Sequence, residues 1–267
     1  MKRWIFAAAI ALTVNVACAI EEKVADDLWQ QIGNSKALNK LRKLADQGDM
    51  VAQDRISLAY LSGRGVKKDL DAARKWLQKA ADQGYAQSQA RLGYIYENGL
   101  GVKKDLDEAV SWYSKAGEQG NVAASYNLGL LYSDGGGLPK HDMSAAKWFR
   151  IAAERGLAEA QLNLGVLYMS EALKQDYAEA FRWLSKAAEA GNAKAMLNLG
   201  RMYQGGWGVT QDDAAALAWY EKAAAAGDWM AMGNISQAYK DGKLGLKQDS
   251  EKAGEWYKKF METQLKR

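Results

Sequence analysis

Histidine and cysteine, two side chains that often carry out acid–base or metal chemistry, are scarce in this chain. Its 267 residues include one histidine, His141, and one cysteine, Cys18. His141 lies in a glycine-rich turn, where a pair with Asp134 or Asp142 and a nearby serine could act as a general base. The sequence shows no nucleophile elbow, no second histidine and no pattern typical of an oxyanion site. A varied turn explains His141 better, and we expect no catalytic residues.

The same scarcity predicts that the chain has no metal site and no cofactor. One histidine and one cysteine cannot supply the ligand sets of zinc sites. An enzyme built on a carboxylate pair stays open, because 32 acidic residues are scattered along the chain. Glu171 is the acid that stands out from the surrounding pattern, and a loop position accounts for it.

One glycine recurs at an almost fixed interval. The recurring residues are Gly48, Gly84, Gly120, Gly156, Gly191 and Gly227, which stand 36, 36, 36, 35 and 36 residues apart. Such a period marks a repeat architecture. Counted from each glycine, position four is small, position eight is Leu or Ile and position twelve is Tyr, which predicts the buried stripe of a helix. Position nine is Gly or Ser, so we expect the backbone of a second helix to pass close to it.

Each copy also predicts that second helix. Five copies place an Asp where it begins, as an N-cap, and Ala-x-x-Trp follows on one helical face. We expect the Trp to be the largest apolar contribution of each copy. The Gly-x-Gly before the Asp is read as a turn with positive φ rather than a phosphate site, because no strand precedes it.

The full pattern is Gly-x-Ala-x-Ala-x-x-x-Leu-Gly-x-x-Tyr, then Gly-x-Gly-Val, Asp, Ala-x-x-Trp-Tyr and Ala-Ala-x-x-Gly. It resembles the Sel-one-like repeat family, relatives of tetratricopeptide repeats, over about residues 36–260. The resemblance implies an all-α fold, a right-handed α-solenoid (superhelix) of antiparallel helix-pair repeats whose first helices line a concave groove. It also implies non-catalytic protein–protein interaction. Because hydrolysis has been attributed to cysteine-rich relatives, the alternative is an envelope hydrolase acting on peptidoglycan or a β-lactam.

The pattern divides the chain into four parts. They are a signal peptide (1–19), a degenerate N-terminal helix pair (20–48), six repeats (about 49–84, 85–120, 121–156, 157–191, 192–227 and 228–260, together 49–260) and a polar tail (261–267).

The first nineteen residues predict export. Lys2 and Arg3 precede an apolar run that is too short to span a membrane, and Ala17-Cys18-Ala19 offers a small-x-small cleavage site. We expect a periplasmic protein without a membrane span. Lipid anchoring at Cys18 is less favoured, because Asn15 stands where a lipobox has Leu, Val or Ile; secretion is the other alternative. Cleavage leaves 34 basic against 32 acidic residues, a balance that argues against a nucleic-acid partner.

Positions three, seven, ten and fourteen of the first helices lie on one helical face, here called the first-helix face. We expect it to bind another protein, either a secreted effector or toxin that the chain neutralises as an immunity protein, or a component of an envelope complex that it serves as an adaptor. Arg and Asn at position seven suit carboxylates and peptide groups, although the asparagines could instead tie one repeat to the next. The predicted partner-binding residues are Arg55, Arg91, Tyr94, Asn127, Asn163, Asn198, Arg201, Asn234 and the turn residue Trp207. Trp229 is expected to cover the C-terminal end of the core.

Overall fold

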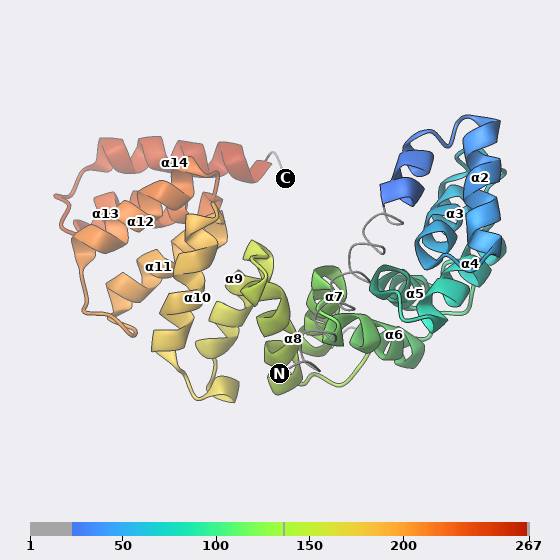
Figure 1. The fold of residues 1–267 in the computed structure, drawn as a ribbon. Helices are drawn as coiled ribbons and strands as arrows, with labels where there is room; N and C mark the ends of the chain where they lie inside the picture. Colours follow the sequence, from blue (N-terminus) through green and yellow to red (C-terminus); the bar gives the residue numbers. More distant parts are fainter. Residues whose placement is uncertain (1–22, 136, 266–267) are drawn as a thin grey trace, which may run out of the picture. The chain divides into compact units, whose positions relative to one another are not determined.

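The computed structural model of the chain describes residues 23–135 and 137–265, and in these ranges the regular structure is helical, without strands (Figure 1). Residues 23–30 form a helix. The others are α2 (Ser35–Asp46), α3 (Met50–Ser62), α4 (Leu70–Asp82), α5 (Ala86–Asn98), α6 (Leu106–Glu118), α7 (Val122–Asp134), α8 (Asp142–Glu154), α9 (Ala158–Tyr168), the short 3-10 helix η1 (Glu171–Leu173), α10 (Tyr177–Glu189), α11 (Ala193–Gly205), α12 (Asp213–Ala225), α13 (Trp229–Asp241) and α14 (Ser250–Leu265). The predicted all-α repeat solenoid is confirmed. The predicted signal peptide lies outside the described residues.

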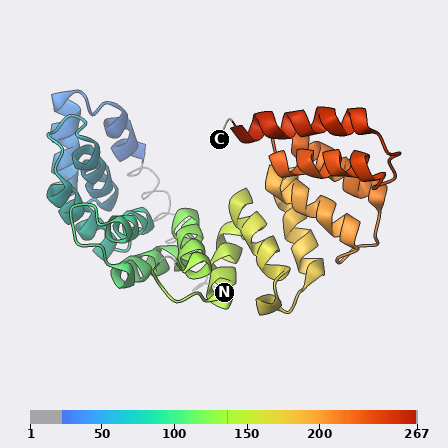
Figure 2. The same cartoon turned by 180° about the vertical axis from the view of Figure 1, so that it is seen from behind.

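Consecutive helices pack as pairs, and each pair packs against the next. Within repeats α3 contacts α4, α5 contacts α6 and α11 contacts α12; between repeats α4 contacts α5 and α12 contacts α13. Figures 1 and 2 show α13 and α14 side by side from opposite directions. The chain divides into two compact units, unit 1 (Met1–Ser125) and unit 2 (Tyr126–Arg267).

The second helices begin at side chains that cap them. Asp69 accepts a hydrogen bond from the backbone N–H of Ala72 at 2.9 Å, and the equivalent Asp of four other copies does the same. In the third copy the Nδ1 of His141 accepts from the backbone N–H of Ser144 at 3.1 Å. An imidazole therefore replaces a carboxylate in a cap that satisfies one of the free N–H groups at a helix start.

Glycine permits most of the turns that flank the second helices, although Lys174 and Gln175 take positive φ before α10. Gly84, after α4, has a φ of +93°, and Gly65, in the Gly-x-Gly turn, has a φ of +74°. A Cβ at Gly65 would also lie 2.6 Å from the carbonyl oxygen of Ile32. Both conformations are costly for residues with a side chain, and the turn predicted for Gly-x-Gly is what the structure has.

Position nine of the inner first helices is a notch for a side chain. A Cβ at Gly93 would lie 2.5 Å from the ring of Tyr113, and one at Gly200 would lie 2.6 Å from the ring of Tyr220. The carbonyl oxygen of Ala216 would lie 3.2 Å from a Cβ at Gly200, so the backbone of the second helix does pass close to this position. The side chain of the residue after the repeat Trp lies closer still and fills the notch.

That residue, rather than the Trp, is the most buried aromatic or aliphatic group of the second helix. Tyr113 and Leu184 are both 0% exposed, whereas Trp112 is 8% exposed and Trp76 is only half-buried. The residue after the Trp is therefore more fully buried than the Trp in these copies, and the expectation that Trp makes the largest apolar contribution of each copy stays a prediction. The Trp faces outward far enough to hold a lysine three residues later, as where the Nζ of Lys79 lies 4.0 Å from the ring centroid of Trp76, a cation–π contact.

The last repeat departs from this packing. Ser236 occupies position nine and donates its hydroxyl hydrogen bond to the carbonyl of Ala253 at 2.7 Å. Tyr257, which follows the last repeat Trp, is 56% exposed. Trp229 packs against Phe260 with ring centroids 5.4 Å apart, the packing role expected for it.

Candidate protein-binding face

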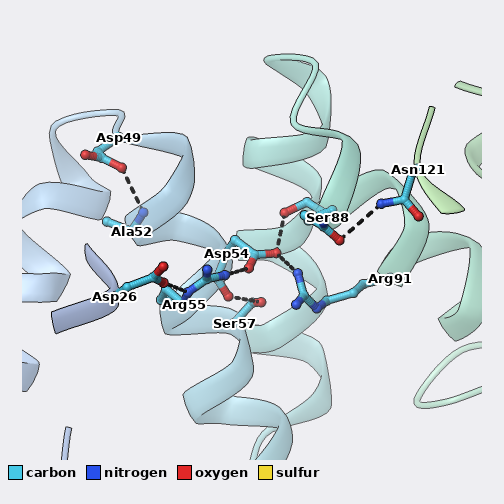
Figure 3. A network of polar contacts seen from close by, with 10 residues as sticks. Asp26, Asp49, Ala52, Asp54, Arg55, Ser57, Ser88, Arg91 and Asn121 are labelled. Atoms are coloured by element: carbon cyan, nitrogen blue, oxygen red, sulfur yellow. Dashed lines mark hydrogen bonds and ion pairs between the residues drawn. The ribbon is translucent and has the colours of Figure 1, made fainter. Parts of the chain in front are cut away.

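A buried carboxylate organises the first-helix face of unit 1. Asp54 of α3 is 0% exposed and accepts hydrogen bonds from the Nη1 of Arg55 at 2.6 Å and the Nη1 of Arg91 at 2.5 Å. The hydroxyl of Ser88 donates a third bond at 2.8 Å. Figure 3 shows the two guanidinium groups on opposite sides of the carboxylate. Because a buried charge is costly without its counter-ions, Asp54 fixes both arginines in place.

The two arginines are engaged to different extents. Arg55 also donates through Nε to Asp26 at 2.6 Å, and its side chain is 15% exposed. Burial of the guanidinium lowers the pKa of Arg55, but the hydrogen bond to Asp26 and the charge of Asp54 outweigh it and raise the pKa above its ordinary value. Among the described residues Arg91 binds only Asp54, through one nitrogen, and its side chain is 31% exposed. Arg55 is therefore enclosed by its own repeat stack, and Arg91 is open on one side.

Position ten of α5 adds an exposed aromatic group. Tyr94 follows Arg91 by three residues, so both side chains lie on one helical face, and Tyr94 is 52% exposed. Towards the start of α5 the amide of Asn121 donates to the Oε1 of Gln87 at 3.1 Å, which links the first turn of α5 to the following repeat.

Unit 2 has asparagine at position seven, and the partners of Asn163, Asn198 and Asn234 are neutral groups. Asn163 hydrogen-bonds with the hydroxyl of Tyr126, whose pKa is raised mainly by burial. The hydroxyl of Tyr220 donates to the Oε1 of Gln204 at 2.6 Å, and burial raises the pKa of Tyr220 to about 12 against the opposing effects of the Arg201 charge and the Asn234 amide. The remaining two asparagines are also engaged and half-buried: Asn198 donates to the carbonyl of Lys194 at 3.0 Å, and Asn127 has an interaction of its own.

Two hollows with mixed polar and apolar linings open beside these asparagines. One of about 330 Å³ is lined by Asn163 together with Glu159 and Lys194, among others. The other, of about 120 Å³, is lined by Asn234 and Asp241, among others. Each hollow places an amide beside charged groups, an arrangement that suits the polar groups of a peptide.

Trp207 lies in the turn after α11 and has a partner of its own. Its ring stacks on Tyr177 at the start of α10, with centroids 6.1 Å apart and planes 21° apart. It is still 41% exposed. The stacking explains how a large apolar side chain is held in an exposed turn, and its predicted contact with a partner stays a prediction.

The repeat pattern has a matching protein family. The Sel1 repeat matches residues 51–85, 86–121, 122–157, 158–192, 193–228 and 229–260. The chain belongs to the Sel1 repeat family.

Two solved Sel1 structures are similar in both sequence and fold. c5321, a protective antigen of uropathogenic Escherichia coli with an SLR fold, is 36% identical over 84% of this chain, with a TM-score of 0.75. This chain spans only 48% of that protein. A Sel1 repeat protein from Oxalobacter formigenes is 34% identical, with 90% of this chain and 96% of the other covered and a TM-score of 0.70.

More distant similarity reaches immunity proteins. PA5088 from Pseudomonas aeruginosa is 20% identical, with 81% of this chain and 82% of the other covered and a TM-score of 0.46, which is too distant to bear on function. A comparison with curated proteins found no match.

The residues of this Sel1 protein that were weighed for catalysis have structural roles. His141 uses Nδ1 as a helix cap, and Asp142 pairs with the Nζ of Lys140 at 3.2 Å. The hydrolase alternative gains no support from this arrangement. Within the described ranges no three His, Cys, Asp or Glu side chains lie close enough together to hold a metal ion, and no helix has the length and apolar character of a membrane span.

Sequence reasoning missed the organising residue of the Sel1 face, Asp54. A signal was present, because position six is uncharged in the other five copies and acidic only here. Arginine occurs at position seven only in the first two copies: Arg55 directly follows Asp54, and Arg91 occupies the same position one repeat later. A comparison of copies position by position for paired exceptions would have found the network.

Proposed function

We propose that this Sel1 repeat protein is exported to the bacterial envelope and binds another protein through its first-helix faces without catalysing a reaction. The observation that carries the proposal is the arrangement of side chains on the first-helix faces. The side chain at position seven is bound by other groups of the protein, and an exposed side chain at position ten lies beside it. In unit 1 the exposed group is Tyr94, 52% exposed, and in unit 2 it is Val166, 44% exposed. Side chains that are already ordered lose little conformational entropy when a partner docks.

Export is supported by the sequence of residues 1–19, where a basic start, an apolar run and a small-x-small site occur in the order of a signal peptide. Cell fractionation and the mass of the mature protein test it. A soluble periplasmic chain that begins at Ile20 supports the proposal. A mature chain that begins with lipidated Cys18 would place the protein on a membrane instead, and an uncleaved cytoplasmic chain would refute export.

Two roles fit binding in the envelope. An immunity protein that neutralises an antibacterial effector, such as one delivered by a type VI system, forms one tight complex with one partner. An adaptor holds several components with weaker affinities. Titration of the captured partner separates them: a one-to-one complex in the nanomolar range supports immunity, and several micromolar partners support the adaptor role.

The face itself is tested by capture of the partner from envelope extract, followed by affinity measurement with the purified pair. The test variant combines Tyr94→Ala with Val166→Ala, which removes exposed groups of the first-helix face. The matched control is Tyr257→Ala, because Tyr257 is similarly exposed, at 56%, and lies on α14. We expect the test variant to lose at least about tenfold in affinity, roughly 1.4 kcal/mol, with unchanged melting. Equal affinities in the test and control variants would show that the partner binds elsewhere.

A further inference from the structure

We propose that Arg91 binds a side-chain carboxylate, an Asp or Glu, of the partner protein, with Tyr94 as the neighbouring apolar contact. This inference rests on the proposed function and names the chemistry of one contact within it.

The guanidinium of Arg91 uses only one of its three nitrogens for hydrogen bonding within the described residues. Asp54 is fully buried and holds Arg91 through Nη1 alone, while Nε and Nη2 of Arg91 have no hydrogen-bond partner among the described residues. The side chain is 31% exposed. An arginine held at one nitrogen keeps a second edge with parallel N–H donors, which is the edge that binds a carboxylate through two hydrogen bonds.

The acidic side chains near the Nε and Nη2 edge of Arg91 have other partners. Asp54 is shared with a second cation, Arg55, and Asp26 is paired with Arg55 on the far side of the network (Figure 3). The single acid of α5, Glu97, accepts a hydrogen bond from the hydroxyl of Tyr113 at 2.7 Å. None of these acids is paired with the free edge of Arg91, so the edge presents positive charge.

An exposed aromatic side chain lies beside the guanidinium of Arg91. Tyr94 lies on the same face as Arg91 and is 52% exposed. Tyrosine and arginine are enriched among residues that dominate binding energy at interfaces. An acidic residue flanked by an apolar one matches this pair in both charge and polarity. The position-seven asparagines of unit 2 cannot supply the charge.

The experiment uses an array of short peptides in which every Asp or Glu peptide has an Asn or Gln counterpart. The full mature chain is expected to bind the best acidic peptides at least about tenfold better than their amide counterparts. Arg91→Lys is the decisive variant, because an ammonium still pairs with Asp54 but lacks the second edge. We expect it to melt like the parent and to lose most of the preference for acids.

The matched control is Arg74→Lys. Arg74 is exposed to a similar extent, 29%, and pairs with Asp71 on α4, so the same chemical change is made outside the first-helix face. It should leave the preference intact. No acidic preference in the parent, or an equal loss in both variants, would overturn the inference. The partner capture described above would then still be sensitive to Tyr94→Ala with Val166→Ala, so the two proposals fail separately.

Discussion

Units 1 and 2 hold the polar side chain at position seven in place with different kinds of partner. In unit 1 this position is arginine, and the buried carboxylate of Asp54 binds two guanidinium groups. In unit 2 it is asparagine, and two of the asparagines pair with the hydroxyls of Tyr126 and Tyr220. Both arrangements order a polar side chain on the first-helix face.

The difference shows which part of the repeat is fixed by packing and which is free to vary. The notch at position nine works in the same way in both units, because the side chain that follows the repeat Trp must fit against the first helix. Position seven lies at the edge of that core, where an ionic or a neutral network is equally compatible with the packing. Binding specificity can therefore change from repeat to repeat while the stack is preserved.

The largest expected effect comes from replacing the two arginines that bind Asp54. Arg55→Met together with Arg91→Met leaves the carboxylate of Asp54 buried without a counter-ion. We expect a loss of about 3 kcal/mol in the free energy of unfolding, at the lower end for buried pairs because both arginines are partly exposed. Urea unfolding measures it. Adding Asp54→Leu should restore most of the loss, and a triple variant no more stable than the double would contradict the buried-charge account.

The shared packing is tested by filling the notch in each unit. Gly93→Ala and Gly200→Ala force a methyl group to within 2.5–2.6 Å of the rings of Tyr113 and Tyr220. We expect each to cost about 1–3 kcal/mol through overpacking, measured by thermal or urea unfolding. Gly254→Ala is the control: a Cβ there meets nothing within 4 Å, so improved helix propensity should stabilise the protein by up to about 1 kcal/mol.

Alkaline pH should act on unit 2 through Tyr220. Burial raises its pKa to about 12, whereas the unfolded phenol titrates near about 10. Between these values the unfolded chain has lost a proton that the folded chain keeps, so the contribution of Tyr220 to stability falls as pH rises. Tyr220→Phe should therefore show a shallower loss of stability above pH ~10 in urea unfolding at successive pH values. Parallel curves for parent and variant would contradict the shift.

The smallest effect is expected for the neutral network. Asn163→Ala removes one hydrogen bond to Tyr126 at a half-buried position, and such a bond contributes about 1 kcal/mol. The loss should be insensitive to salt, because neither partner is charged. A loss as large as that of the arginine double variant would erase the contrast between the two units.

The sequence alone determined the repeat period, the helix pairs and the turns between them. The Asp caps and the positive-φ glycines are local features, because a cap or a turn involves backbone groups a few residues away. The cap at His141 shows the limit of this reasoning. The position of His141 in the repeat predicted a helix start. Only the structure showed that its Nδ1 accepts the capping hydrogen bond that a carboxylate accepts in the other copies.

The tertiary structure alone decided which side chains meet. Asp26 and Arg55 are 29 residues apart, and Asp54 and Arg91 are 37 apart, so their network exists only when successive repeats stack. The same holds for the side chain that occupies each notch, which is the residue after the repeat Trp. Periodicity assigns a residue to a face of its own helix, but the residues opposite that face are set by the packing of neighbouring helices, which depends on the shapes of all the side chains between them.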